Sequence, residues 1–167
     1  MFTADDPADV IMILIGLSLL IGYLITLIFF LIAQQNTLKA IKPHNRKMQP
    51  GEVWLQLIPV FNLIWQFIVV GRISDSIRNE INDRNLNSFL GIADPVFAND
   101  LTKRPTYDMG LTFCILSLCG CIPLLGGIAS IAGIVCWIIY WTQIVAYKNK
   151  FLNNPLSNQD FSPPSGP

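Results

Sequence analysis

The feature that most constrains this chain is a run of 24 residues, Val10 to Ala33, without one charged side chain. About 20 apolar residues wound into an α-helix span the hydrocarbon core of a bilayer. A helix is required because no water is present there, so every backbone N–H and C=O must find its partner within the segment. The run therefore predicts a transmembrane helix over residues 10–33.

The composition agrees with a membrane protein. Of the 167 residues, 52% are hydrophobic and 13% are charged, whereas soluble domains carry about 25% charged residues. The net charge is zero, so a strongly basic face that would neutralise phosphates is not expected, and neither is nucleic-acid binding. The partners we expect are the lipid bilayer and other membrane protein subunits.

The second apolar segment, residues 53–82, is interrupted by polar residues and by Pro59. A proline lacks the amide donor and clashes with the preceding turn, so the helix should break there. Beyond residue 70, apolar residues recur at helical spacing, which predicts an amphipathic helix that leaves the membrane and continues along its surface. Residues 53–70 then either enter the bilayer and return, as a re-entrant segment, or cross it as a fourth span.

Two more apolar stretches, residues 106–121 and 126–147, predict a helical hairpin. Residues 151–167, rich in Pro, Ser and Asn, predict a disordered tail. The expected fold is an all-α integral membrane protein with a single helical membrane domain over residues 1–150. It would contain three transmembrane helices, the proline-broken segment and the amphipathic surface helix.

The positions of Lys and Arg predict the orientation, because these residues favour the cytoplasmic side when they lie close to a span. If residues 53–70 are re-entrant and the N-terminus is outside, all eleven Lys and Arg are cytoplasmic, as is the C-terminus. Four full spans with the N-terminus inside would place seven of them inside and four outside. The charge distribution favours the re-entrant arrangement, and the four-span arrangement is the alternative.

Enzymatic chemistry is not expected. It would need a nucleophile with a base, paired carboxylates, or metal ligands at workable spacing. The one histidine, His44, lies in a basic loop, and the four cysteines lie in apolar sequence with no His or carboxylate beside them. We expect no catalytic residues, no cofactor and no bound metal.

The candidate residues for binding a ligand or a partner lie in and just after the proline-broken segment. They are Gln56, Asn62, Gln66, Arg72 and Asp75. Polar side chains at membrane depth need partners and often mark functional sites. For Arg72 the simpler interpretation is an anchor whose charged end reaches the membrane surface.

Two further sets of residues are candidates for lipid binding and for helix packing. Anionic lipid would be held by the cations of the loop after the first span, Lys39, Lys42, Arg46 and Lys47. Small residues at four-residue spacing allow close approach of helices. Gly126 with Ser130, and Ala129 with Gly133, have this spacing, which makes Gly126, Ser130 and Gly133 candidates for a packing face. That face would lie either inside the protein or against another subunit.

The stretch NRKMQPGEVWLQLIPVFNLIWQF, residues 45–67, resembles a recurring signature of small uncharacterised bacterial multi-span membrane proteins. The segments ISDSI at 73–77 and WIIYW at 137–141 fit the same pattern. The resemblance implies a bacterial cytoplasmic (inner) membrane. It implies no activity, so no functional residue is carried over from it.

Taken together, these features predict a non-catalytic membrane protein, an accessory or scaffold subunit that packs within a larger membrane complex. The alternative is a carrier or channel for a small solute. It rests on the proline-broken segment, its Gln and Asn residues, and a weak repeat of the pair Ile-Pro at 58–59 and 122–123. A weaker alternative is an anionic-lipid-binding membrane protein that uses the basic loop.

Overall fold

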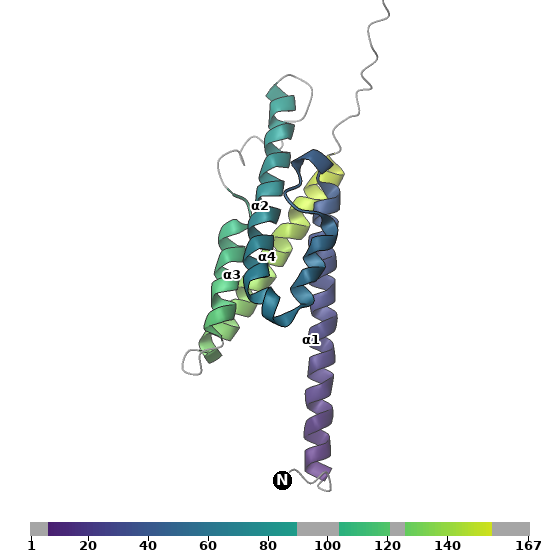
Figure 1. Cartoon of the computed structure of the whole chain (residues 1–167), viewed down its shortest axis with the longest axis vertical. Coiled ribbons are helices and arrows are strands. Elements are labelled where there is room, and N and C mark those ends of the chain that lie inside the picture. Colours follow the sequence, from purple (N-terminus) through teal and green to yellow (C-terminus); the bar gives the residue numbers. More distant parts are fainter. Residues whose placement is uncertain (1–6, 90–103, 121–125, 155–167) are drawn as a thin grey trace, which may run out of the picture.

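The computed structural model describes residues 7–89, 104–120 and 126–154, and within these ranges every regular element is helical. The α-helices are α1 (Pro7–Ala40), α2 (Pro59–Phe89), α3 (Tyr107–Cys119) and α4 (Gly126–Asn153), and short 3-10 segments form η1 (Pro43–Asn45) and η2 (Pro50–Leu57). Figure 1 shows them packed side by side, with the N-terminal half of α1 projecting beyond the others. The expected all-α fold is confirmed.

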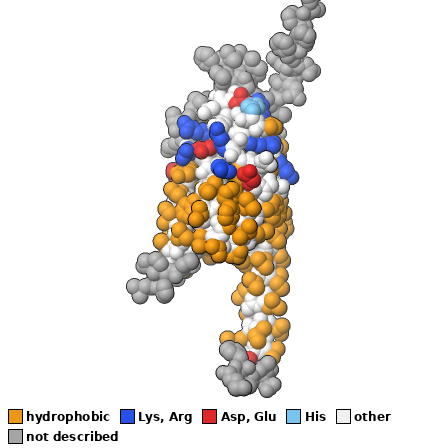
Figure 2. Space-filling view, in the orientation of Figure 1, with side chains coloured by type: hydrophobic (Ala, Val, Ile, Leu, Met, Phe, Trp, Pro, Cys, Tyr) orange, Lys and Arg blue, Asp and Glu red, His pale blue; other side chains and the backbone are white. Residues whose placement is uncertain are grey.

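In the described residues, three helices are long and apolar enough to cross a membrane: α1, Pro59–Asn85 of α2, and Gly127–Asn153 of α4. Helix α3 has 13 residues, a length of roughly 20 Å, which is less than the hydrocarbon thickness of about 30 Å. Apolar side chains cover α1 and the adjoining part of the body, and Lys, Arg and His gather at the end away from the N-terminus (Figure 2). The chain is therefore a helical membrane protein with one charged end.

Helix α1 is longer than the predicted span at both ends, with 34 residues and a length of about 50 Å. Its most apolar 18-residue window is not buried at all within the protein. Burial begins at Phe30 and continues to Leu38 on the face toward the other helices. The N-terminal part of α1 thus offers its whole apolar circumference to lipid or to another helix.

The break expected at Pro59 is present as a reversal of chain direction. Segment η2 runs alongside α1 away from the charged end, and α2 begins at Pro59 and returns toward that end (Figure 1). Proline is tolerated at the first position of a helix, where its missing N–H has no intrahelical partner to lose. The two arms are joined by the indole of Trp65, whose Nε1 donates to the carbonyl oxygen of Glu52 at 3.0 Å.

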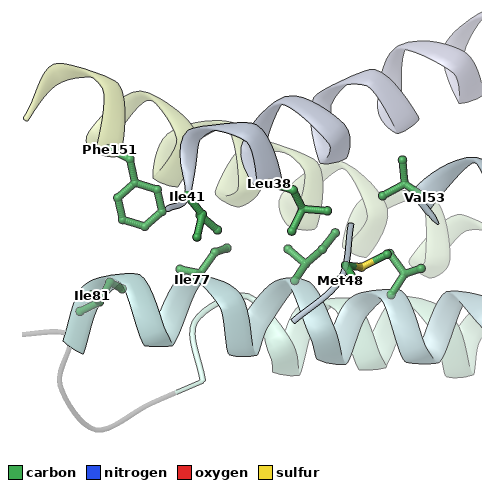
Figure 3. Close-up of a cluster of buried hydrophobic side chains, with 9 residues drawn as sticks. Leu38, Ile41, Met48, Val53, Ile77, Ile81 and Phe151 are labelled. Carbon is green, nitrogen blue, oxygen red and sulfur yellow. The ribbon is translucent and has the colours of Figure 1, made fainter. Parts of the chain in front are cut away.

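The apolar face of α2 beyond residue 70 differs from the expectation. We predicted that Ile73, Ile77 and Ile81 would lie on the membrane surface, but they are buried within the protein, at 0–1% exposure. They pack against the end of α1, the loop after it, η2 and the end of α4, through residues that include Leu38, Ile41, Met48, Val53 and Phe151 (Figure 3). The same helical periodicity suits a membrane surface and a protein core, so the pattern alone does not distinguish them.

The predicted hairpin corresponds to α3 and α4, with different ends. Helix α4 continues to Asn153, so the first residues of the predicted tail are helical, and Phe151 is 2% exposed. A buried aromatic side chain of this size holds the end of the helix against the core. Residues 155–167 of the tail and the second Ile-Pro pair, 122–123, lie outside the described residues.

The small residues of α4 face α3. A Cβ at Gly133 would lie 3.6 Å from Cβ of Leu116, and Ser130 Oγ lies 3.3 Å from the Cβ position of Gly120. The third residue of that set, Gly126, begins α4. Gly133 and Ser130 therefore lie close to α3 of the same chain.

Candidate binding cavity

A cavity of about 490 Å³ lies among α1, η2, α2, α3 and α4. Sites for small molecules usually enclose about 300–1,000 Å³. Its apolar wall includes Phe30, Phe113, Leu116 and Trp137, and its polar side chains include Thr26, Gln56, Asn62, Gln66, Ser117 and Ser130. A mostly apolar wall with a few converging polar groups is typical of a small-molecule site.

Three of the five candidate residues predicted from the sequence meet at this cavity: Gln56, Asn62 and Gln66. The chain reversal at Pro59 brings them together, because Gln56 lies on the incoming arm and the other two lie one turn apart on the outgoing helix. Residues four apart share a helix face. Gln56 is 8% exposed and Gln66 is 6% exposed.

Gln56 is held in place by a residue that the sequence analysis missed, Gln34 of α1. The Nε2 of Gln56 donates to Oε1 of Gln34 at 2.6 Å and to the carbonyl oxygen of Val53 at 3.1 Å. Gln34 is 1% exposed. The signal that could have found it is the continuation of residues 34–40 without Pro or Gly, which favours one helix through the end of the apolar run.

The amide of Asn62 has hydrogen-bonding capacity to spare. Its Oδ1 is buried without a hydrogen-bond partner among the described residues, and the amide of Gln66 lines the same cavity. An amide removed from water without a hydrogen bond costs roughly 2–7 kcal/mol. Oδ1 of Asn62 is therefore the acceptor in this cavity that a ligand can use.

The cavity is uncharged. The described residues that line it include no Asp, Glu, Lys, Arg or His. The nearest charged residues of α2 lie farther along the helix and have partners elsewhere. What the arrangement can do is donate and accept hydrogen bonds to a neutral molecule.

Arg72 and Asp75, the remaining two candidates, do not join the cavity. Arg72 lies 3.4 Å from the carboxylate of Glu52 and its guanidinium is 5.6 Å from the ring centroid of Trp65. Asp75 pairs with Arg104 at 3.0 Å. All four charged side chains are about one-third to one-half exposed, which fits an anchor at the boundary of the apolar region better than a buried binding site.

The basic loop is partly used for internal contacts. Nζ of Lys42 lies 2.7 Å from Asp83, and the Nε of Arg46 donates to the carbonyl oxygen of Ile41 at 2.8 Å, which caps the end of α1. Only two of the four lipid-binding candidates, Lys39 and Lys47, have exposed side chains. This loop is accordingly less suited to anionic lipid than the sequence suggested.

A second buried polar cluster, centred on Glu80, holds the charged end together. Glu80 is 0% exposed and accepts hydrogen bonds from Nε of Arg84 at 2.9 Å, Nδ2 of Asn45 at 2.9 Å and the backbone N–H of Lys42 at 3.1 Å. Arg84 also donates to the carbonyl oxygens of the α4 end, at Phe151 and Asn154. The pair Glu80–Arg84 thus ties α2 to the end of α1 and to the end of α4.

Comparisons of the chain with protein-family models, with curated proteins and with solved structures found no match.

Proposed function

We propose that this protein is a non-catalytic integral membrane protein that binds a small solute in the cavity of Gln56, Asn62 and Gln66, and acts as its carrier. The observation that carries the proposal is Oδ1 of Asn62, which is buried without a protein partner in a cavity that Gln66 also lines. Polar groups in such a place are costly and mark substrate pathways or binding sites.

The proposed orientation places the charged end in the cytoplasm of a bacterium and the N-terminus outside its inner membrane, with η2 and the start of α2 as a re-entrant segment. The reversal at Pro59 supports this, since both arms lead back to the charged end. Non-helical backbone at membrane depth is tolerated only where protein or a water cavity covers it. Val53 and Gln56 of η2 are buried, as that requirement demands.

Reporter fusions test this orientation. Fusions after residues 45, 95 and 160 are expected to report the cytoplasm at all three positions. A periplasmic signal at residue 45 or at residue 95 would instead mean that residues 53–70 cross the bilayer completely.

Labelling of single cysteines tests the proposed site. In a chain whose four natural cysteines are replaced by Ala, we expect Asn62→Cys and Gln66→Cys to react with N-ethylmaleimide about tenfold faster than Ile64→Cys. The reactive thiolate forms where polar groups or water surround it, and is disfavoured in apolar surroundings. Ile64 is 70% exposed on the outer face of the same helix and is the matched control.

Reaction at positions 62 and 66 no faster than at position 64 would contradict a polar, accessible cavity. Protection of position 66 by a bound molecule, with no change at position 64, would then identify solutes that occupy it.

A second candidate function, the accessory or scaffold subunit, is favoured by the exposed half of α1. Met12 and Leu19 are 70% and 69% exposed, and added side chains at Gly16 or Gly22 would meet nothing within 4 Å in the chain. A larger residue in place of Gly22 should leave the protein folded and should release a partner subunit during purification in mild detergent. A wild-type chain that purifies as a lone monomer counts against this candidate.

A further inference from the structure

The depth of the cavity restricts the charge of its ligand. On α1 it is lined by Tyr23, Thr26, Leu27 and Phe30, all within the charge-free run of residues 10–33. A phosphate or ammonium carried to this depth would lose its hydration, and no opposite charge among the described lining residues would replace it. A neutral headgroup avoids this cost.

The amide groups of Asn62 and Gln66, which both line the cavity, indicate which hydrogen bonds the ligand can make. Oδ1 of Asn62 can only accept, so the ligand needs an N–H or O–H donor. The Gln66 amide offers both a donor and an acceptor, so a group that accepts as well as donates satisfies it. A hydroxyl has both capacities on one atom.

Two lining residues of the cavity, Tyr23 on α1 and Ile134 on α4, are 61% and 55% exposed. Their exposure indicates that the cavity opens between α1 and α4. Toward the charged end it is closed by Phe30, 3% exposed, whose ring centroid lies 5.4 Å from that of Trp137, and by the hydrogen bond between Gln56 and Gln34. A ligand therefore reaches the amides sideways from the bilayer.

We infer that the ligand is a neutral lipid with a hydroxyl-bearing headgroup, which enters between α1 and α4 and hydrogen-bonds to Asn62 and Gln66. This inference rests on the proposed binding function and names its substrate class. The volume of about 490 Å³ holds the headgroup and the first carbons of the chains. The rest of each chain stays in the bilayer at the open side.

Native mass spectrometry of the full chain in detergent, with equimolar dioleoylglycerol and dioleoylphosphatidic acid, tests the inference. The two lipids have the same acyl chains and differ by the phosphate. We expect about tenfold more bound dioleoylglycerol, because the phosphate cannot be paired in the cavity. Gln66→Leu and Asn62→Leu should each lower that binding about tenfold, whereas Ile64→Ala, on the outer face of α2, should leave it unchanged.

The wild-type competition does not depend on whether the variants fold. If the wild type instead binds more dioleoylphosphatidic acid than dioleoylglycerol, and Gln66→Leu loses that preference, the inference of a neutral headgroup is wrong. The proposed binding function would still stand. If the wild type and every variant bind both lipids equally, the inference that the ligand is a lipid is wrong. In that case fast labelling at position 66 still supports a water-soluble solute, and slow labelling there ends the proposed function as well.

Discussion

Replacing Glu80 with Ala is expected to lower the free energy of unfolding by about 3–5 kcal/mol, the cost of removing one partner of a buried ion pair. The side chains of Glu80 and Arg84 are 0% and 7% exposed. Without the carboxylate, the guanidinium of Arg84 remains buried as an uncompensated charge, and the hydrogen bonds from Asn45 and Lys42 are lost. Thermal unfolding in detergent, followed by size-exclusion chromatography, measures the loss.

Two further variants compare the effect of this buried ion pair with that of an ion pair at the surface. Asp75→Asn breaks a partly exposed pair with Arg104 and should cost under about 1 kcal/mol. The double variant Glu80→Met with Arg84→Met should recover much of the stability lost in Glu80→Ala, because no unpaired charge is left. If Glu80→Ala unfolds at the same temperature as Asp75→Asn, the cluster does not hold the charged end together.

Replacing Gly110 with Ala is expected to destabilise the protein by about 2–3 kcal/mol, because the added methyl group has no room. Its Cβ would lie 2.5 Å from Cγ1 of Val70 and 2.8 Å from Cε2 of Tyr140. Neither neighbour can give way easily, since Val70 is 2% exposed and Tyr140 is 0% exposed. Helix α3 would have to move away from α2 and α4, and the midpoint of thermal unfolding should fall by about 5–10 °C.

Gly133→Ala is the matched control, because its Cβ would meet the nearest atom at 3.6 Å, an ordinary contact. It should change stability by no more than about 0.5 kcal/mol. Combining Gly110→Ala with Val70→Ala removes the closest clashing atom and should restore part of the loss. Equal stability of the two glycine variants would mean that α3 does not pack against Val70 and Tyr140 as described.

The sequence predicted those parts of the fold that depend on local chemistry. The charge-free run of residues 10–33 requires a helix in lipid, and it lies within α1. Pro59 lacks an amide donor, and the chain reverses there. Glu80 and Arg84 lie four residues apart, a spacing that favours ion pairs on a helix, and they are 2.9 Å apart in the structure.

Features that depend on distant parts of the chain were not predictable in the same way. Asp75 has Arg78 at helical spacing, yet its partner is Arg104, 29 residues away. The burial of Ile77 and Ile81 depends on the ends of α1 and α4. Amphipathic spacing indicates that a face is covered, and it does not say by what.

The candidate site was predicted in part for a related reason. Asn62 and Gln66, four apart, share a helix face, whereas Arg72 is six residues beyond Gln66 and points elsewhere. Gln56 joins the cavity through the reversal at Pro59. Gln34, which fixes Gln56, comes from a helix whose packing against η2 the sequence did not specify.

Alkaline carbonate extraction of membranes that contain the full chain tests the central claim, that lipid surrounds α1 and the apolar surfaces of α2 and α4. The exposed apolar side chains of these helices are stable only in lipid or detergent. The protein is expected to remain in the membrane pellet and to need detergent for release. Release into the carbonate supernatant, followed by a monodisperse peak in buffer without detergent, would contradict the claim.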